Sequence, residues 1–241
     1  MKLRVMTYNL QSGMNAEYQP DHPAQCQVIA TEKPDILGCE EVAVYRRMKP
    51  DLNMVTVMAE TLKMNSGFAK AIDLPAEGPN SEYGVAAFSK YPMDFVDKAF
   101  LPSAAEARVF GVFRIHGEKD FYFVVTHFLY NGECEGDEEK RVESVKTIEK
   151  YLADHNYYPA ILVGDLNASP DSPSIQYLHE VADVWNDADK ETKTCYSSKQ
   201  GWVQIDYIAS FPKGAVSLDK FYFGENNTAS DHRPVIADLI L

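Results

Sequence analysis

The sequence predicts an α/β protein in which two β-sheets pack face to face and helices lie on their outer faces. Apolar segments of strand length outnumber helical segments, and both types occur along the whole chain. No repeat period, low-complexity tract or flexible linker interrupts this order. We therefore expect residues 1–241 to form a single domain, which is common for α/β chains of this length.

The first half of the chain contains two helices and several strands. The helices are expected at residues 22–33 and 51–63, and the strands at residues 3–10, 34–42 and on both sides of a loop within residues 66–90. The first helix should end at Lys33, because Pro34 disfavours helical backbone in the residue before it.

The second half contains the clearest helix, at residues 138–154. Four of its apolar residues recur on one face: Val142, Val145, Ile148 and Leu152. We expect Asp137 to be its N-cap, and Ser172 and Pro173 to begin a shorter helix as N-cap and first helical residue. Strands are expected at residues 107–115, 119–129, 160–167, 202–210, 214–223 and 234–241.

The composition excludes several classes of protein. Apolar residues make up 45% of the chain and aromatic residues 12%, which is enough for a large core and argues against disorder. There is no apolar run long enough to span a bilayer, and the first residues lack the features of a signal peptide. We expect a cytoplasmic protein, which we take to be a monomer.

The four cysteines are widely scattered, at Cys26, Cys39, Cys134 and Cys195. Since no CxxC pair occurs, the spacing suggests neither a zinc site nor a disulfide framework. Reduced thiols fit best, and Cys39 is most simply a small buried residue inside an apolar strand.

Polar residues recur near one end of six apolar strands. They are Asn9, Glu40, Glu41, His127, Asp165, Asn167, Asp206, Asp231 and His232. A turn before the last strand explains Ser230 and Pro234 but gives no reason for an imidazole. Burying such groups without partners would cost several kcal/mol each. We therefore expect them to line a common cleft, where carboxylate and amide oxygens suit Mg²⁺, Mn²⁺ or Ca²⁺ better than zinc.

Taken singly, these residues have simpler interpretations. Asn9 could bond backbone groups at a strand end, and Asp165 with Asn167 could form an ordinary turn. His127 could be a core histidine, and Arg108 could be solvated or ion-paired. Their joint occurrence in order favours a functional cleft.

The ordered motifs resemble those of a known superfamily. The segments "TYN", "PDILGCEEV", "THF", "GDLNASP", "IDYI" and "SDHRPV" are similar to those of the endonuclease/exonuclease/phosphatase superfamily, which includes deoxyribonuclease I, exonuclease III, sphingomyelinases and inositol polyphosphate phosphatases. The resemblance extends from Thr7 to Val235. It implies a four-layer α/β sandwich that hydrolyses a phosphoester with a divalent cation, Mg²⁺ or Mn²⁺.

The resemblance also implies roles for individual residues. Asp165, with Asn167 beside it, would orient and deprotonate the attacking water. His232 would stabilise the phosphoryl group in transfer, and Asp206 would hold His232.

Further roles concern the cation and the phosphate. Asn9, Glu41 and Asp231 would be the metal-site residues, His127 would face the phosphate, and Arg108 would contact the substrate. These roles agree with the needs of in-line attack on phosphorus: neutralised oxygens, a positioned water and a stabilised leaving group.

Two positions depart from the superfamily pattern. Glu40 stands where members usually have Gln, and Gln204 stands where they often have Arg. Because adjacent strand residues point to opposite faces, only one of Glu40 and Glu41 should face the site. We favour Glu41 because Val42 follows it, as in the family motif.

The expected substrate is a small phosphoester or a lipid head group. The net charge is −13, from 36 acidic and 23 basic residues, which disfavours duplex nucleic acid. The loops available to grip a duplex would be residues 11–22, 43–50, 66–82 and 192–202. Arg46, Arg47 and Lys49 form the one basic cluster in these loops, and Lys70 is set against Asp73, Glu77 and Glu82. Lys193 and Lys199, with the aromatic Trp202, could add late contacts.

Three alternatives remain open at this point. A repair-type DNA nuclease would share the same motifs. A glycoside hydrolase could use two carboxylates, although it would leave Asn9, Asn167 and the Asp-His pair unexplained. An inactive relative serving as a binding module would be expected to lack a metal ligand or His232, and neither is missing.

Overall fold

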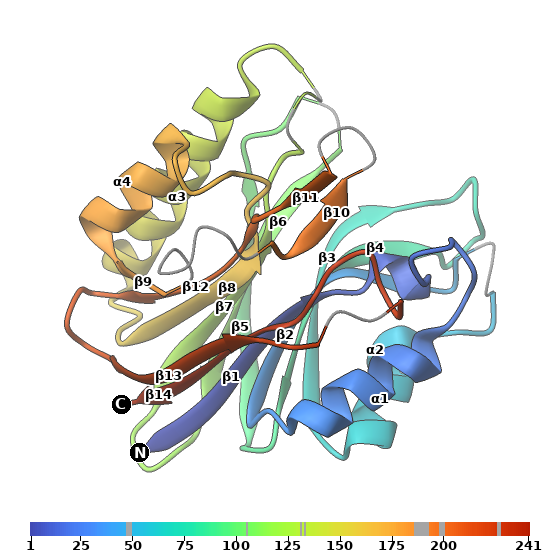
Figure 1. Ribbon diagram of the computed structural model, residues 1–241, viewed down its shortest axis with the longest axis horizontal. Helices are drawn as coiled ribbons and strands as arrows, with labels where there is room; N and C mark the ends of the chain where they lie inside the picture. The colour runs from blue at the N-terminus through green and yellow to red at the C-terminus, as the bar shows by residue number, and fades with distance from the viewer. Residues whose placement is uncertain are drawn as a thin grey trace.

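The computed structural model describes residues 1–46, 50–104, 106–130, 132, 134–185, 193–197, 201–225 and 228–241. Its main body consists of two six-stranded mixed sheets that pack face to face, with helices on both outer faces (Figure 1). The predicted fold class, a sandwich of two mixed sheets flanked by helices, is confirmed.

The first sheet has the strand order β13-β14-β1-β2-β4-β3. Its strands are β1 (Lys2–Asn9), β2 (Ile36–Val44), β3 (Asn65–Asp73), β4 (Glu82–Ser89), β13 (Ser217–Phe223) and β14 (Val235–Ile240). The central strands β1 and β2 run parallel, and the other pairs are antiparallel. Helices α1 (His22–Glu32) and α2 (Met54–Leu62) cover the outer face, and a short 3₁₀ helix (Gln11–Gly13) follows β1.

The second sheet has the order β5-β6-β7-β8-β12-β9. Its strands are β5 (Met93–Leu101), β6 (Arg108–Ile115), β7 (Phe121–His127), β8 (Ala160–Asp165), β9 (Asp183–Val184) and β12 (Asp206–Phe211). Only β7 and β8 pair in parallel. Helices α3 (Asp137–His155) and α4 (Pro173–Val181) cover its outer face. A separate pair, β10 (Cys195–Ser197) and β11 (Gly201–Val203), lies beyond the two sheets.

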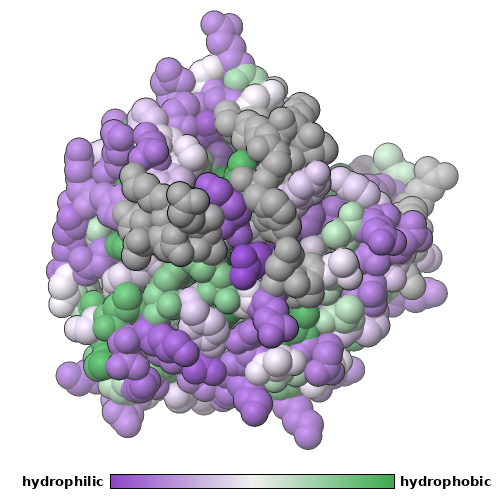
Figure 2. Space-filling view, viewed as in Figure 1, coloured by the Kyte–Doolittle hydropathy of each residue, from purple (hydrophilic) through white to green (hydrophobic). Residues whose placement is uncertain are grey.

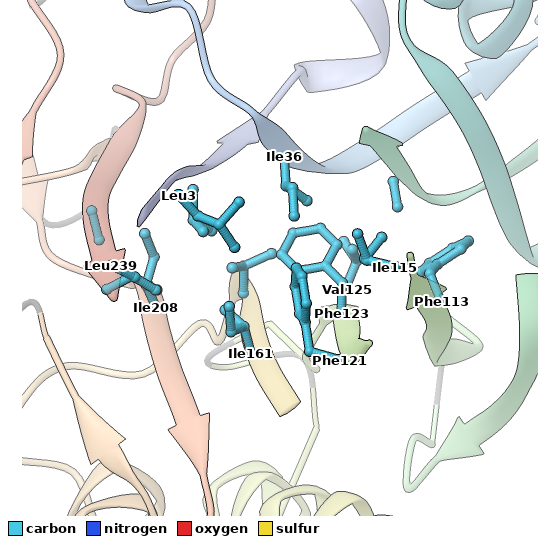
Figure 3. Packing of buried hydrophobic residues seen from close by; sticks show 14 of the residues in the cluster. Leu3, Ile36, Phe113, Ile115, Phe121, Phe123, Val125, Ile161, Ile208 and Leu239 are labelled. Carbon is cyan, nitrogen blue, oxygen red and sulfur yellow. The ribbon is translucent and has the colours of Figure 1, made fainter. Parts of the chain in front are cut away.

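Alternation along the strands builds three hydrophobic layers. In β7, Phe121, Phe123 and Val125 point into the layer between the two sheets, whereas Val124 packs toward α3 and α4. Figure 3 shows residues of both sheets, among them Leu3 and Ile161, converging on this central layer. The sandwich therefore has four layers held by two helix-to-sheet cores and one sheet-to-sheet core.

The two sheets approach one another closely at Gly38 of β2. A Cβ atom there would lie 2.3 Å from Val163 Cγ2 and 3.2 Å from both γ-carbons of Val125. Both valines belong to the opposite sheet. A side chain larger than hydrogen would therefore force the sheets apart or displace β7 and β8.

Three predicted helix ends can be compared with the structure. Helix α1 ends just before Pro34, as expected. Lys33 is its C-cap in the left-handed conformation, and the backbone N–H of Lys33 donates to Ile29 O. Ser172 and Pro173 begin α4 as predicted. The prediction that Asp137 is an N-cap was wrong: Gly136 is the N-cap, and Asp137 is the first helical residue, with a carboxylate that accepts from the backbone N–H of Gly132.

Several strands differ from the prediction. The segment 202–210 is not one strand, since β11 ends at Val203 and β12 begins at Asp206. Strand β5 was missed because its residues have no clear alternation. The first half of the segment 66–82, which was expected to be a substrate loop, belongs to strand β3, so that residues 74–81 alone connect β3 to β4.

The outer surface seen in Figure 2 is mostly hydrophilic, with smaller hydrophobic areas in its lower part. Among the described residues, no helix combines the length and the apolar character that a membrane span would need.

Candidate active site

One end of the sandwich contains a cavity of about 530 Å³. Strands β1, β2, β7 and β8 end there, and β12 and β14 begin there. The predicted residues that line the cavity are Glu41, Arg108, His127, Asp165, Asn167, Asp231 and His232. Asn9 and Asp206 lie directly behind this lining, fully buried and bonded to it. All nine predicted site residues thus meet at one place.

Asp165 lies at the centre of the cavity, at the end of β8, and is 2% exposed. Its Oδ1 accepts from the backbone N–H of Asn167 at 2.9 Å, and its Oδ2 accepts from Asn9 Nδ2 at 3.0 Å. Burial and the nearby carboxylate of Asp206 raise the pKa of Asp165 to about 7, and His232 opposes this shift. The result is a buried, oriented carboxylate that can accept a proton near neutral pH.

Asp206 and His232 form a buried pair across the two sheets. His232 Nδ1 lies 3.0 Å from each carboxylate oxygen of Asp206, and its Nε2 lies 3.7 Å from Asp165 Oδ2. Burial alone would lower the pKa of His232, but the carboxylate of Asp206 raises it well above its ordinary value. His232 is therefore an oriented imidazolium on the cavity wall.

His127 is held beside this pair in a different charge state. Arg108 Nη1 lies 3.1 Å from His127 Nδ1, and Asn167 Nδ2 lies 3.0 Å from His127 Nε2. Burial, together with the positive charge of Arg108, lowers the pKa of His127 well below its usual value. A neutral imidazole and a charged guanidinium thus occupy one wall of the cavity. Arg108 also pairs with Glu106, at 3.1 Å.

A β-bulge in β2 places the side chains of Glu40 and Glu41 in different surroundings. Strand β2 advances by three residues from Cys39 to Val42 while β4 advances by two, and Glu41 adopts a left-handed backbone with φ of 55°. Glu41 consequently lines the cavity, as we favoured from the motif.

Glu40 is fully buried and does not line the cavity. Its Oε1 accepts from Thr7 Oγ1 at 2.8 Å. Burial and the charges of Asp206 and Asp165 raise its pKa well above its ordinary value. Strict alternation of faces does not hold here, because the bulge adds one residue to β2. Glu40 therefore lies in the interior, close to the carboxylates of Asp165 and Asp206, and Glu41 lies at the cavity.

The donors available to a divalent cation are mainly carboxylate oxygens. Glu41 and Asp231 both line the cavity. Among the described residues, two groups bring their ligand atoms close enough together to hold such an ion: Asp165, Asp206 and His232, and Cys195, Asp231 and His232. Asn9 donates its Nδ2 to Glu41 Oε1 at 3.3 Å, while its Oδ1 accepts from the backbone of Gln11. In this orientation the amide nitrogen of Asn9 holds the carboxylates of Glu41 and Asp165, and its oxygen is not directed to the cavity.

Sequence patterns did not identify several other residues of the cavity wall. Three tyrosines stand at its edge, Tyr18, Tyr130 and Tyr196, with 70%, 40% and 54% of their surface exposed. Cys195 also lines it and is 7% exposed. These residues come from loops and a short strand without a motif, so nothing in the sequence placed them at the site.

The chain belongs to the endonuclease/exonuclease/phosphatase family, whose model matches residues 6–232. Members of this family are hydrolases that act on phosphoesters. No curated protein matches the sequence.

Solved structures with the same fold cover nearly all of the chain. An endonuclease/exonuclease/phosphatase from Beutenbergia cavernae DSM 12333 is similar with a TM-score of 0.77 and 21% identity, over 100% of this chain and 72% of that one. The catalytic domain of human Nocturnin, with bound sulfate, has a TM-score of 0.73 and 18% identity, over 99% and 94%. A mannosyl-6-phosphatase from Bacteroides thetaiotaomicron VPI-5482 has a TM-score of 0.65 and 19% identity, over 99% and 100%.

Proposed function

We propose that the protein is a divalent-metal-dependent phosphoester hydrolase that activates a water for in-line attack on a small phosphoester or a lipid head group. The observation that best supports this proposal is the meeting of two units in one cavity: the oriented carboxylate of Asp165 and the Asp206–His232 pair. A base and a cationic group within one cavity are what phosphoryl transfer to water requires.

Asp165 is the proposed base for the attacking water. Each of its oxygens accepts one hydrogen bond from the protein, and a carboxylate oxygen has capacity for a second. Asn9 and the backbone of Asn167 therefore fix the carboxylate without blocking it. The water would give its proton to Asp165 as the new oxygen–phosphorus bond forms.

His232 is the proposed stabiliser of the phosphoryl group. Its Nδ1 is occupied by Asp206, so Nε2 is the nitrogen that can donate to a phosphoryl oxygen. Arg108 adds a second positive charge from the opposite sheet. His127, whose two ring nitrogens lie against Arg108 and Asn167, positions these two side chains on the cavity wall. Preorganised donors of this kind act where negative charge develops.

The hard-oxygen character of Glu41 and Asp231 fits Mg²⁺ or Mn²⁺. Such an ion would neutralise the oxygens around phosphorus and supply further coordination sites through water. Asn9 would keep Glu41 in place by its amide hydrogen bond.

The size of the cavity supports a small substrate. About 530 Å³ falls within the usual range for small-molecule sites. A mannosyl-6-phosphatase, whose name indicates a small phosphorylated substrate, has the same fold.

Metal dependence gives the first test. We expect hydrolysis of a chromogenic phosphodiester or phosphomonoester in Mg²⁺ or Mn²⁺, complete loss of hydrolysis with a chelator, and recovery when the ion is added back. Glu41→Gln should raise the Mg²⁺ concentration needed for half-maximal rate, since it removes a charged ligand. Glu17→Gln, which changes an exposed residue, is the matched control. Full activity in the chelator would contradict the proposal and favour a metal-independent hydrolase.

Weak binding of duplex DNA is the second expectation. The predicted basic cluster is reduced in the structure, because Arg46 forms an ion pair with Glu77. Lys70 likewise pairs with Asp73 and Glu82. Tight duplex binders make roughly six to ten phosphate contacts. Of the other predicted contributors, Lys193 is described and half-buried. Arg47, Lys49 and Lys199, and the side chain of Trp202, lie outside what the structure describes.

Fluorescence anisotropy with the inactive variant Asp165→Ala would measure this affinity at physiological salt. We expect a dissociation constant well above the micromolar range. Sub-micromolar binding would instead favour the second candidate function, a repair-type DNA nuclease. A screen of nucleotides, sugar phosphates and phospholipids with the active protein would then identify the substrate class.

A further inference from the structure

Cys195 brings a soft donor into a cavity of otherwise hard donors. It is the first residue of β10, and it forms an isolated β-bridge with His232. The adjoining backbone bonds are Tyr196 N–H to Asp231 O, at 2.9 Å, and Arg233 N–H to Thr194 O, at 2.7 Å. The segment that contains Asp231 and His232 is therefore held in register against β10.

The side chains of Cys195, Asp231 and His232 converge from this backbone arrangement. One ligand atom from each lies within 4.8 Å of the other two, and all three residues line the cavity. The thiol of Cys195 also hydrogen-bonds to His232. The other described thiols lie elsewhere, since Cys26 and Cys39 belong to the core under α1 and α2 and Cys134 does not line the cavity.

Two of the three donors, the thiol of Cys195 and the imidazole of His232, differ in kind from the proposed magnesium ligands Glu41 and Asp231, and the carboxylate of Asp231 is common to both sets. A thiolate, an imidazole and a carboxylate form the type of set that binds zinc, with a fourth position left to water. His232 is already oriented for such a role, because zinc-binding histidines commonly donate their second nitrogen to a carboxylate, and His232 has Asp206 in that place.

We propose that Cys195, Asp231 and His232 form an inhibitory site for thiophilic divalent cations such as Zn²⁺. Binding forms a metal–sulfur bond to Cys195 and a metal–nitrogen bond to His232 Nε2. The thiol proton and the Nε2 proton of the imidazolium are both released to solvent, with no change of oxidation state. The ion occupies His232 Nε2, the atom needed by the phosphoryl group, and competes for Asp231. The inhibition rests on the proposed function, whereas the binding does not.

Cobalt is the probe for binding, because a cobalt–thiolate bond gives a charge-transfer absorption band. We expect this band when Co²⁺ is added to the protein, its loss in Cys195→Ser and Cys195→Ala, and its retention in the matched control Cys134→Ser. Circular dichroism of each variant verifies folding. A band of unchanged strength in either folded Cys195 variant, or no band in the unchanged protein, would overturn the proposal.

Inhibition is measured separately, as the Zn²⁺ concentration that halves the Mg²⁺-supported rate, with each variant compared against its own rate without zinc. Loss of the thiolate should raise this concentration by about ten- to a hundredfold, as removal of metal-site groups does. Equal sensitivity in Cys195→Ser and the unchanged protein would refute the inhibitory role. Absence of any hydrolysis would instead count against the proposed function, and the cobalt band would still decide whether the site exists.

Discussion

Replacing Asp165 with Asn is expected to lower kcat for phosphoester hydrolysis by about a hundred- to ten-thousandfold, the range typical of a removed general base. Asn keeps the shape of the side chain but cannot accept the proton of the attacking water. It also brings an amide group against the Asn9 Nδ2, which now donates to Asp165 at 3.0 Å. Steady-state kinetics at saturating Mg²⁺ would measure the loss.

Asp171→Asn is the matched control for this substitution. Asp171 lies six residues further along the same segment and is exposed. Its neutralisation should leave kcat within about twofold, because surface substitutions away from special features have small effects. If Asp165→Asn retained full activity while folded, the assignment of Asp165 as the base would be wrong.

Replacing His232 with Ala is expected to have a similarly large effect, a loss of about a hundredfold or more in kcat. The substitution removes the imidazolium and leaves the carboxylate of Asp206 buried without its cationic partner. Asp206→Asn should cost less, because it weakens the positioning of His232 without removing the ring. The two variants therefore distinguish the proposed role of His232 at the phosphoryl group from the proposed role of Asp206 in positioning that ring.

His116→Ala serves as the histidine control. His116 lies after the far end of β6 and pairs with Asp94 and Asp120 on the surface. Its loss should leave hydrolysis unchanged. Equal activity of His232→Ala and the unchanged protein, with an unaltered circular dichroism spectrum, would remove His232 from the proposed chemistry.

Much of the fold could be predicted from local pattern. Buried strands such as β1 and β8 are short apolar runs with a polar residue at one end, and this pattern survives in the structure because these strands lie between two apolar layers. The strand-end residues were recognised because isolated burial of Asn9, Asp165 or Asp206 would be costly. Their convergence in one cavity is a consequence of the parallel and antiparallel order of the strands.

Other features depend on contacts that no local pattern encodes. The bulge that turns Glu41 to the cavity is a property of the pairing between β2 and β4. Cys195 reaches the site because β10 pairs with the backbone just before β14. This bridge joins Cys195 to His232, which are 37 residues apart along the chain. The capping error at Asp137 arose because Gly136, with φ of 70°, takes the cap position.

The close approach of the two sheets at Gly38 has a mechanical consequence for the candidate active site. Asn9, Glu41 and His232 belong to the first sheet or its connections, whereas His127, Asp165 and Asp206 belong to the second. The hydrogen bonds from Asn9 to Asp165 and from His232 to Asp206 therefore connect the two sheets at the candidate site. A larger side chain at Gly38 is therefore expected to lengthen these two bonds and to disturb the proposed active site from within the core.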